Sequence, residues 1–130
     1  MRVALDTNAY SDWRKTGEWG EVISAADEVF VPSIVLGEMR FGFAQGSRAA
    51  LNERKLEDFL RNPVVHVGVV GERTSQHYAR LKDFLKKNGT PIPENDIWIA
   101  SCALEVDATL LTRDRHFEML PQVSVMWLEH

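Results

Sequence analysis

Three aspartates stand directly beside apolar runs of the chain, where a charged side chain lies at the edge of a buried core. Asp6 ends the run RVALD, and Asp96 opens the helix-like stretch DIWIASCALE. Asp114 comes two residues after the run ATLLT. Carboxylates gathered in one place hold divalent cations, and a cation-bound water can be deprotonated to attack a phosphodiester. We therefore expect these aspartates to bind metal for phosphodiester chemistry.

Glu38 is the fourth acid and the hardest to explain as an ordinary surface charge. Its neighbours at helical spacing include Ile34 and Phe41. A buried carboxylate without a partner is costly or changes its protonation. No lysine or arginine occurs between Lys15 and Arg40 to pair with it locally. A cation from solution would fill that role.

Each aspartate also has a purely structural explanation. Asp6 could form an Asx-turn or cap a helix, and Asp96 and Asp114 could each be the N-cap of a helix. One acid that caps a helix is common, whereas four acids at one edge of a sheet are not. For Asp96 we expect both roles, capping and coordination, with the helix dipole favouring its ionised form.

The available ligand types favour Mg²⁺, with Mn²⁺ as its substitute, because all-oxygen sites suit hard cations. The four histidines and the single cysteine, Cys102, show no zinc-binding spacing. His116 lies near Asp114 and could touch substrate, although a structural or solvent-exposed role is the favoured interpretation. Thr112, at the end of its apolar run, could orient an acid or a metal-bound water through its hydroxyl.

The elements that position these acids follow from the hydrophobic pattern. Strands are predicted at residues 2–6, 28–33, 63–70, 108–112 and 123–128. Helices are predicted at residues 16–27, 33–46, 47–62, 72–89 and 96–105, with a short helix in RDRHFEML. Strands that alternate with helices indicate an α/β fold, a parallel sheet of about four to five strands with helices on both faces. Such a sheet brings the carboxyl ends of its strands to one edge, where ligands bind.

Composition and charge limit the alternatives. The 130 residues fit a single domain, residues 1–130, and no apolar run approaches the roughly 20 residues that cross a bilayer. The start MRVALDTN leads into a strand without a signal peptide, and one cysteine fits a cytoplasmic protein. The net charge of −4 provides no global field for a polyanionic partner, so contacts with one are expected from local arginines. Arg113 and Arg115 are the first candidates and Arg40 the next.

Four stretches, LDTNAYSD, PSIVLGEMRFG, IPENDIWIASCAL and LLTRDRHFEMLP, have the order and character of PIN-domain ribonucleases. The chain resembles in particular the VapC-type toxins of bacterial and archaeal toxin–antitoxin pairs, essentially over its whole length. The resemblance implies a PIN-like three-layer sandwich and a catalytic Mg²⁺ site of four acids: Asp6, Glu38, Asp96 and Asp114. It implies that Asp6 and Asp96 are direct ligands and that the other two acids act through water or at a second metal. The supporting residues are then Asn8 and Thr112.

The resemblance also implies partners, namely a VapB-type antitoxin, an RNA substrate and a second copy of the chain. Phe41 and Phe43 are two residues apart on one predicted helix, so both cannot face the sheet. We expect part of this helix, with the region around Trp13 and Trp19, to form an antitoxin groove beside the acids. A basic residue of the antitoxin would then enter the acidic pocket in place of Mg²⁺.

Together these features predict a Mg²⁺-dependent endoribonuclease toxin that cleaves structured cellular RNA by a metal-activated water. Two alternatives remain open. One is a Mg²⁺-dependent phosphatase with Asp6 as nucleophile, because Asp6-Thr7-Asn8 faintly resembles a DxD motif, although position 8 lacks the second acid. The other is a PIN-fold binding module without catalysis. A nuclease assay with EDTA and the trapping of a phosphoenzyme distinguish the three.

Overall fold

The apolar runs form one parallel sheet, in the order β3-β2-β1-β4-β5. The computed structural model describes residues 1–128. The strands have these bounds: β1 (Arg2–Leu5), β2 (Glu28–Pro32), β3 (Val65–Gly68), β4 (Thr109–Thr112) and β5 (Val125–Trp127). The predicted fold class, an α/β protein with a parallel sheet, is confirmed, and the sheet has five strands.

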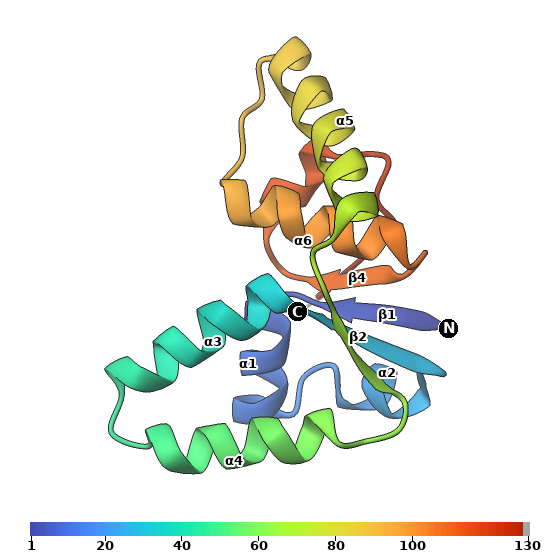
Figure 1. Ribbon diagram of the computed structural model, residues 1–130. Helices are drawn as coiled ribbons and strands as arrows, with labels where there is room; N and C mark the ends of the chain where they lie inside the picture. The colour runs from blue at the N-terminus through green and yellow to red at the C-terminus, as the bar shows by residue number, and fades with distance from the viewer. Residues whose placement is uncertain (129–130) are drawn as a thin grey trace.

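Helices cover both faces of this sheet (Figure 1). Residues 1–128 form six α-helices and one short 3₁₀ helix: α1 (Thr7–Thr16), α2 (Gly20–Ala25), α3 (Ser33–Gln45), α4 (Ala49–Leu60), α5 (Glu72–Asn88), α6 (Glu94–Glu105) and η1 (Arg115–Met119). Helices α1, α2 and α4 lie on one side of the sheet, and α5 and α6 lie on the other. Helix α3 extends from the end of β2 and pairs with α4. The arrangement is the predicted three-layer sandwich.

The central strand is buried on both faces, which explains why its sequence is continuously apolar. Val3, Ala4 and Leu5 of β1 are all 0% exposed. Helix α6 contacts β2 and β4 and buries Ala100 and Ala103. Their small side chains let the helix approach the strands closely. The apolar runs beside the aspartates therefore form the core and carry the aspartates to its edge.

The N-terminal third departs from the prediction. Residues 16–27 were predicted as one helix, but they contain the end of α1, a turn and the short α2. Helix α1 begins at Thr7, directly after β1, because Asp6 caps it. It ends at Gly17, whose φ of 82° lies in the left-handed region that glycine adopts without strain. The polar stretch DTNAYSD has little apolar periodicity, so the pattern did not indicate this helix.

Other elements are close to prediction, with shorter ends. The strands expected at 63–70 and 123–128 are confined to Val65–Gly68 and Val125–Trp127, and RDRHFEML forms a 3₁₀ helix. Within residues 1–128, no helix has both the length and the apolar character to cross a membrane.

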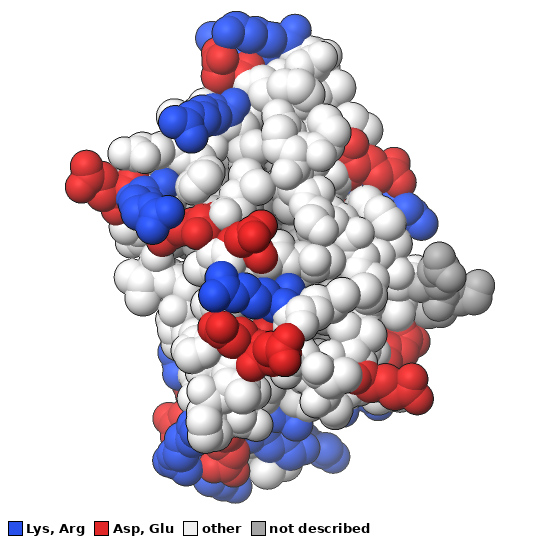
Figure 2. All heavy atoms as spheres, turned by 90° about the vertical axis from the view of Figure 1, so that its right-hand side faces the viewer, with Lys and Arg blue, Asp and Glu red and all other residues white. Residues whose placement is uncertain are grey.

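The edge at which the strands begin carries mixed charge. Figure 2 shows this face, and its acidic and basic side chains alternate in small groups. The Met1 amino group pairs with Asp27 here, and Arg2 lies 3.4 Å from Glu28. Because opposite charges lie side by side, this face offers no extended field to attract a polyanion. The features that suit such a partner lie at the carboxyl edge of the sheet.

Candidate functional site

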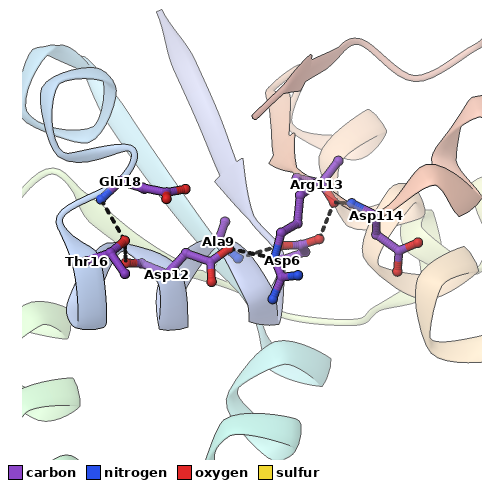
Figure 3. Close-up of polar contacts among 8 residues, drawn as sticks. Asp6, Ala9, Asp12, Thr16, Glu18, Arg113 and Asp114 are labelled. Atoms are coloured by element: carbon purple, nitrogen blue, oxygen red, sulfur yellow. Dashed lines mark hydrogen bonds and ion pairs between the residues drawn. The ribbon is translucent and has the colours of Figure 1, made fainter. Parts of the chain in front are cut away.

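Asp6 is buried where β1 ends and α1 begins, and it is only 4% exposed. Its Oδ1 accepts a hydrogen bond from the Ala9 backbone N–H at 2.7 Å, and its Oδ2 accepts one from the Thr112 hydroxyl (Figure 3). Burial raises the pKa of the Asp6 carboxyl from 3.8 to about 6. The two hydrogen bonds oppose this rise, and the charges of Asp114 and Asp96 add to it. Asp6 is therefore both a helix cap and an acid of the site.

Thr112 links the ends of the two central strands. It is 0% exposed; its Oγ1 donates to Asp6 and accepts from the Asp114 backbone N–H at 2.9 Å (Figure 3). Strand β4 pairs with β1 so that Leu111 lies opposite Leu5, which brings together the residues that follow each strand. This geometry suits the supporting role predicted for Thr112, because its hydroxyl contacts both Asp6 and the backbone of the loop that carries Asp114.

Asp96 lies in the first turn of α6 and is not its N-cap. The helix begins at Glu94, with Pro93 in the cap position at φ −56°. The Asp96 backbone N–H donates to the Pro93 carbonyl at 3.0 Å. The predicted capping role is therefore wrong, because the helix starts two residues earlier than residue 96. The carboxylate is left to interact with groups across the site.

Asp96 and Asp114 meet at the ring of His116. The Nδ1 atom of His116 lies 2.9 Å from Asp96 Oδ2 and 3.0 Å from Asp114 Oδ1. Asp114 also caps η1, because its Oδ1 accepts from the His116 backbone N–H at 3.0 Å. The hydrogen bond with Asp96 is the main cause that raises the pKa of His116. The structural or solvent-exposed role favoured from sequence is therefore incomplete: the ring is half exposed, but its Nδ1 edge belongs to the acidic cluster.

Glu38 reaches the same region from α3. Its Oε1 accepts from the Thr7 hydroxyl at 2.6 Å, and Asn95 Nδ2 lies 3.4 Å from its Oε2. Glu38 is half-buried, and these polar partners replace the wholly apolar surroundings expected from its helical neighbours. Sequence reasoning missed Thr7 and Asn95 as its partners, since both contacts join distant parts of the chain. Asn8 lies beside Thr7 in the first turn of α1, and its supporting role stays a prediction.

The side chains present fit a divalent cation. The ligand atoms of Asp96, Asp114 and His116 all lie within 4.8 Å of one another, a separation that one ion can bridge. Burial raises the pKa of Asp96; the hydrogen bond with His116 opposes this rise, and the charges of Asp114 and Glu38 add to it. A bound cation relieves such repulsion. The carboxylate oxygens of this cluster are donors that suit Mg²⁺ or Mn²⁺.

The three arginines predicted to contact RNA all form ion pairs at the surface: Arg113 with Asp12 at 2.7 Å, Arg115 with Glu118 at 2.9 Å and Arg40 with Glu53 at 2.9 Å. Figure 3 shows Arg113 crossing from the end of β4 to Asp12 on α1, beside Asp6 and Asp114. Exposed pairs of this kind contribute about 0 to 1 kcal/mol, so they can open to accept a phosphate.

A groove of about 530 Å³ begins at Glu38 and runs between α1, α3 and α4. Phe43 is part of its apolar lining. Its basic lining comes from α1 and from α4 with its N-cap residue: Arg14, Lys15, Arg48 and Lys55. Only the packing of the three helices shows that they face a shared groove that leads to an acid of the site.

The aromatic residues expected in this groove divide into different roles. Trp13 packs against Phe59 with ring centroids 4.9 Å apart, and Trp19 is 8% exposed in the core. The region around Trp13 does line the groove, through residues such as Tyr10 and Arg14, but the Trp13 ring itself packs toward α4. The region around Trp19 lies outside the groove lining. Phe43 lines the groove as expected, whereas Phe41 is 69% exposed and lies outside its lining.

A model of the PIN domain family matches residues 3–122. The chain belongs to the PIN domain family. This PIN domain is 28% identical to Ribonuclease VapC4 of Mycobacterium tuberculosis over 125 residues, which is 95% of this chain and 88% of the relative. It is also 28% identical to Ribonuclease VapC2 of Rickettsia felis over 104 residues, 79% of this chain and 76% of that one.

Solved structures share the fold of this PIN domain. VapBC-1 from nontypeable Haemophilus influenzae superposes with a TM-score of 0.86 at 27% identity over 98% of each chain. VapBC2 from Rickettsia felis, bound to a promoter DNA fragment, gives a TM-score of 0.82 at 24% identity over 97% of this chain and 98% of that one. The resemblance to PIN-domain ribonucleases of the VapC type, drawn from four motifs, is confirmed.

Proposed function

We propose that this PIN domain is an endoribonuclease that depends on Mg²⁺ or Mn²⁺, and that it is the toxin of a VapBC-type pair acting on structured cellular RNA. The observation that carries the proposal is the meeting of the acids at one sheet edge, with Thr112 joining Asp6 to the loop of Asp114. The relatives named Ribonuclease VapC support it. The test is cleavage of cellular RNA by the purified protein, with and without EDTA, beside the Asp96→Asn variant.

The residues divide the work of the reaction. A bound divalent cation supplies an activated water and offsets charge on the phosphorus oxygens. Asp6 is fixed by two hydrogen bonds. Its carboxylate therefore needs no rearrangement to direct its remaining lone pairs toward a bound cation. Glu38 is half-buried and its Oε1 is held by Thr7. Its Oε2, which lies 3.4 Å from Asn95 Nδ2, is placed to accept a proton from an attacking water.

The two alternative functions have less support. Aspartyl phosphatases need an exposed nucleophilic oxygen, whereas both Asp6 oxygens already accept hydrogen bonds and the residue is 4% exposed. A binding module without catalysis would not need to keep four acids together, where the neighbouring charges add to the raised pKa of Asp6 and of Asp96. Phosphoenzyme trapped on Asp6 would favour the first alternative, and RNA binding without metal-dependent cleavage would favour the second.

We further propose that the RNA backbone follows the groove between α1, α3 and α4. Arg48 and Lys15 line it, and the described residues give neither side chain an ion-pair partner. Arg48→Ala should weaken RNA binding and reduce the slope of log K against log salt by about 0.7 to 0.9, the contribution of one phosphate. Arg115→Ala, closer to the acids, should have the same effect. Fluorescence anisotropy with a labelled RNA across a salt series measures both.

The matched control for this series is Arg73→Ala on α5, across the sheet from the groove. It should leave the salt slope unchanged. If Arg48→Ala and Arg115→Ala, singly and combined, behave like the control, the RNA binds elsewhere.

We propose that an antitoxin segment occupies the same groove and thereby excludes RNA. Phe43 is the aromatic anchor in its lining, and buried aromatic anchors supply much of the affinity at such interfaces. Phe43→Ala should lower the yield of complex when the chain is co-expressed with a VapB-type antitoxin and purified by pull-down. Phe41→Ala is the matched control, since it removes an aromatic ring from the same helix outside the groove.

Equal recovery of antitoxin by wild type and Phe43→Ala would place the antitoxin elsewhere. Circular dichroism shows whether each variant keeps its fold. The homodimer implied by the resemblance stays a prediction, and sedimentation of the purified chain measures it.

A further inference from the structure

The imidazole of His116 faces the same point as two of the carboxylates. Its Nδ1 atom lies 2.9 Å from Asp96 Oδ2 and 3.0 Å from Asp114 Oδ1. The backbone that carries the ring is fixed, because the His116 N–H donates to Asp114 and the next residue, Phe117, is 2% exposed in the core. The ring, which is half exposed, takes its direction from the contacts of Nδ1 with the two carboxylates.

The three groups have the geometry of ligands to one ion. Their nearest ligand atoms all lie within 4.8 Å of one another, and Asp96 of α6 and Asp114 at the start of η1 both approach the same Nδ1 atom. Asp6 keeps a free lone pair on each oxygen beyond its hydrogen bonds with Ala9 and Thr112, so it can also face the cation. The imidazole is thus a further candidate ligand beside the acids.

We propose that His116 is a direct metal ligand through Nδ1, so that its imidazole joins Asp96 and Asp114 around the cation and the site prefers Mn²⁺ to Mg²⁺. This inference rests on the proposed function, because it concerns the same cation. Mg²⁺ takes oxygen ligands almost exclusively, whereas imidazole suits the softer transition metals. The ligand nitrogen must be deprotonated, so the cation replaces any proton that Nδ1 shares with the two carboxylates.

A positioning role is the competing explanation for the same distances. His116 could donate from Nδ1 to the two acids and orient them while the cation contacts oxygen atoms alone. The variant His116→Asn separates the two roles. Its amide can still donate a hydrogen bond close to the Nδ1 position, but an amide nitrogen has no lone pair to offer a metal.

The experiment measures Mn²⁺ binding to the purified protein at neutral pH by electron paramagnetic resonance. Pulsed spectra report whether a ¹⁴N nucleus is coupled directly to the bound Mn²⁺. Wild type should show the nitrogen coupling, and His116→Asn should lose it. The variant should bind Mn²⁺ roughly tenfold or more weakly, since even loss of an outer-shell partner costs about that much. Mg²⁺ affinity, measured by competition, should fall much less. His66→Asn is the matched control, because His66 is exposed on β3, an edge strand that is separated from β1 by β2.

Each other outcome overturns the inference. Bound Mn²⁺ without nitrogen coupling in wild type, together with loss of binding in Asp96→Asn, removes His116 as a ligand and leaves the proposed metal site standing. Coupling or full Mn²⁺ affinity that persists in His116→Asn assigns the histidine to positioning. Failure of the wild type to bind Mn²⁺ at all overturns both the inference and the metal dependence in the proposed function.

Discussion

Asp96→Asn is expected to abolish most RNA cleavage, by roughly a hundredfold or more, while the fold is retained. The substitution preserves the shape of a side chain that lies in the first turn of α6 and takes no part in capping that helix. It removes one of the two acids that meet at His116 and so removes a ligand charge from the site. Cleavage of cellular RNA, with EDTA-treated wild type as reference, measures the loss.

The same variant should lose its stabilisation by metal. Only the folded chain gathers the acids, so a cation at about a hundred times its Kd adds about 2.7 kcal/mol of stability. For a chain of this size, that raises the melting temperature of wild type by roughly 5 to 10 °C. Asp83→Asn, which removes an exposed carboxylate on α5, is the control and should respond like wild type. An equal Mn²⁺-dependent shift in wild type and Asp96→Asn would show that the site is misassigned.

Asp6→Asn is expected to raise the stability of the metal-free protein at pH 7. Burial raises the pKa of Asp6 from 3.8 to about 6, so folding places a charged carboxylate where the neutral form is favoured. At about 1.4 kcal/mol for each pKa unit, removing that charge adds on the order of 2 to 3 kcal/mol. Asparagine can still accept the Ala9 hydrogen bond that caps α1. Thermal unfolding in EDTA measures the gain.

The pH dependence of this gain has a definite sign. Between pH 3.8 and about 6 the folded protein binds more protons at Asp6 than the unfolded chain does. Stability of wild type therefore falls as pH rises through this window, and the advantage of Asp6→Asn grows with it. Below about pH 4 the two proteins should unfold alike. Saturating Mn²⁺ should reverse the order at pH 7, because the cation favours the charged acid that the variant lacks. A variant less stable than wild type at pH 7 in EDTA would contradict this account.

The sequence by itself determined which acids meet and at which edge. Asp6 and Asp114 follow apolar runs directly, and parallel strands joined by helices must end on the same side of the sheet. Their convergence depends only on the order of strands and helices along the chain and on the strands being parallel. The hydrophobic pattern of the sequence predicts both. The same reasoning predicted that Thr112, at the end of its strand, would act beside an acid, and the hydroxyl does link β4 to Asp6.

Helix boundaries were harder to predict from the sequence where the first residues of the helix are polar. Helix α1 begins with Thr7 and Asn8 and lacks a clear apolar stripe, so it was missed. The early start of α6 was missed as well, because the extended backbone of Pro93 places the helix boundary two residues before Asp96. Each error changed the assigned role of a side chain without moving its acid away from the sheet edge.

Only the tertiary structure decided which side chains touch. His116 and Asp96 are 20 residues apart, and their contact at 2.9 Å depends on how η1 packs against α6. Thr7 and Glu38 meet across 31 residues because α1 and α3 pack together. The basic lining of the groove likewise comes from two separate segments, α1 and α4 with its N-cap. Periodicity assigns a residue to a face of one element; the partner across that face is set by the packing of two elements, which depends on the volumes of the side chains between them.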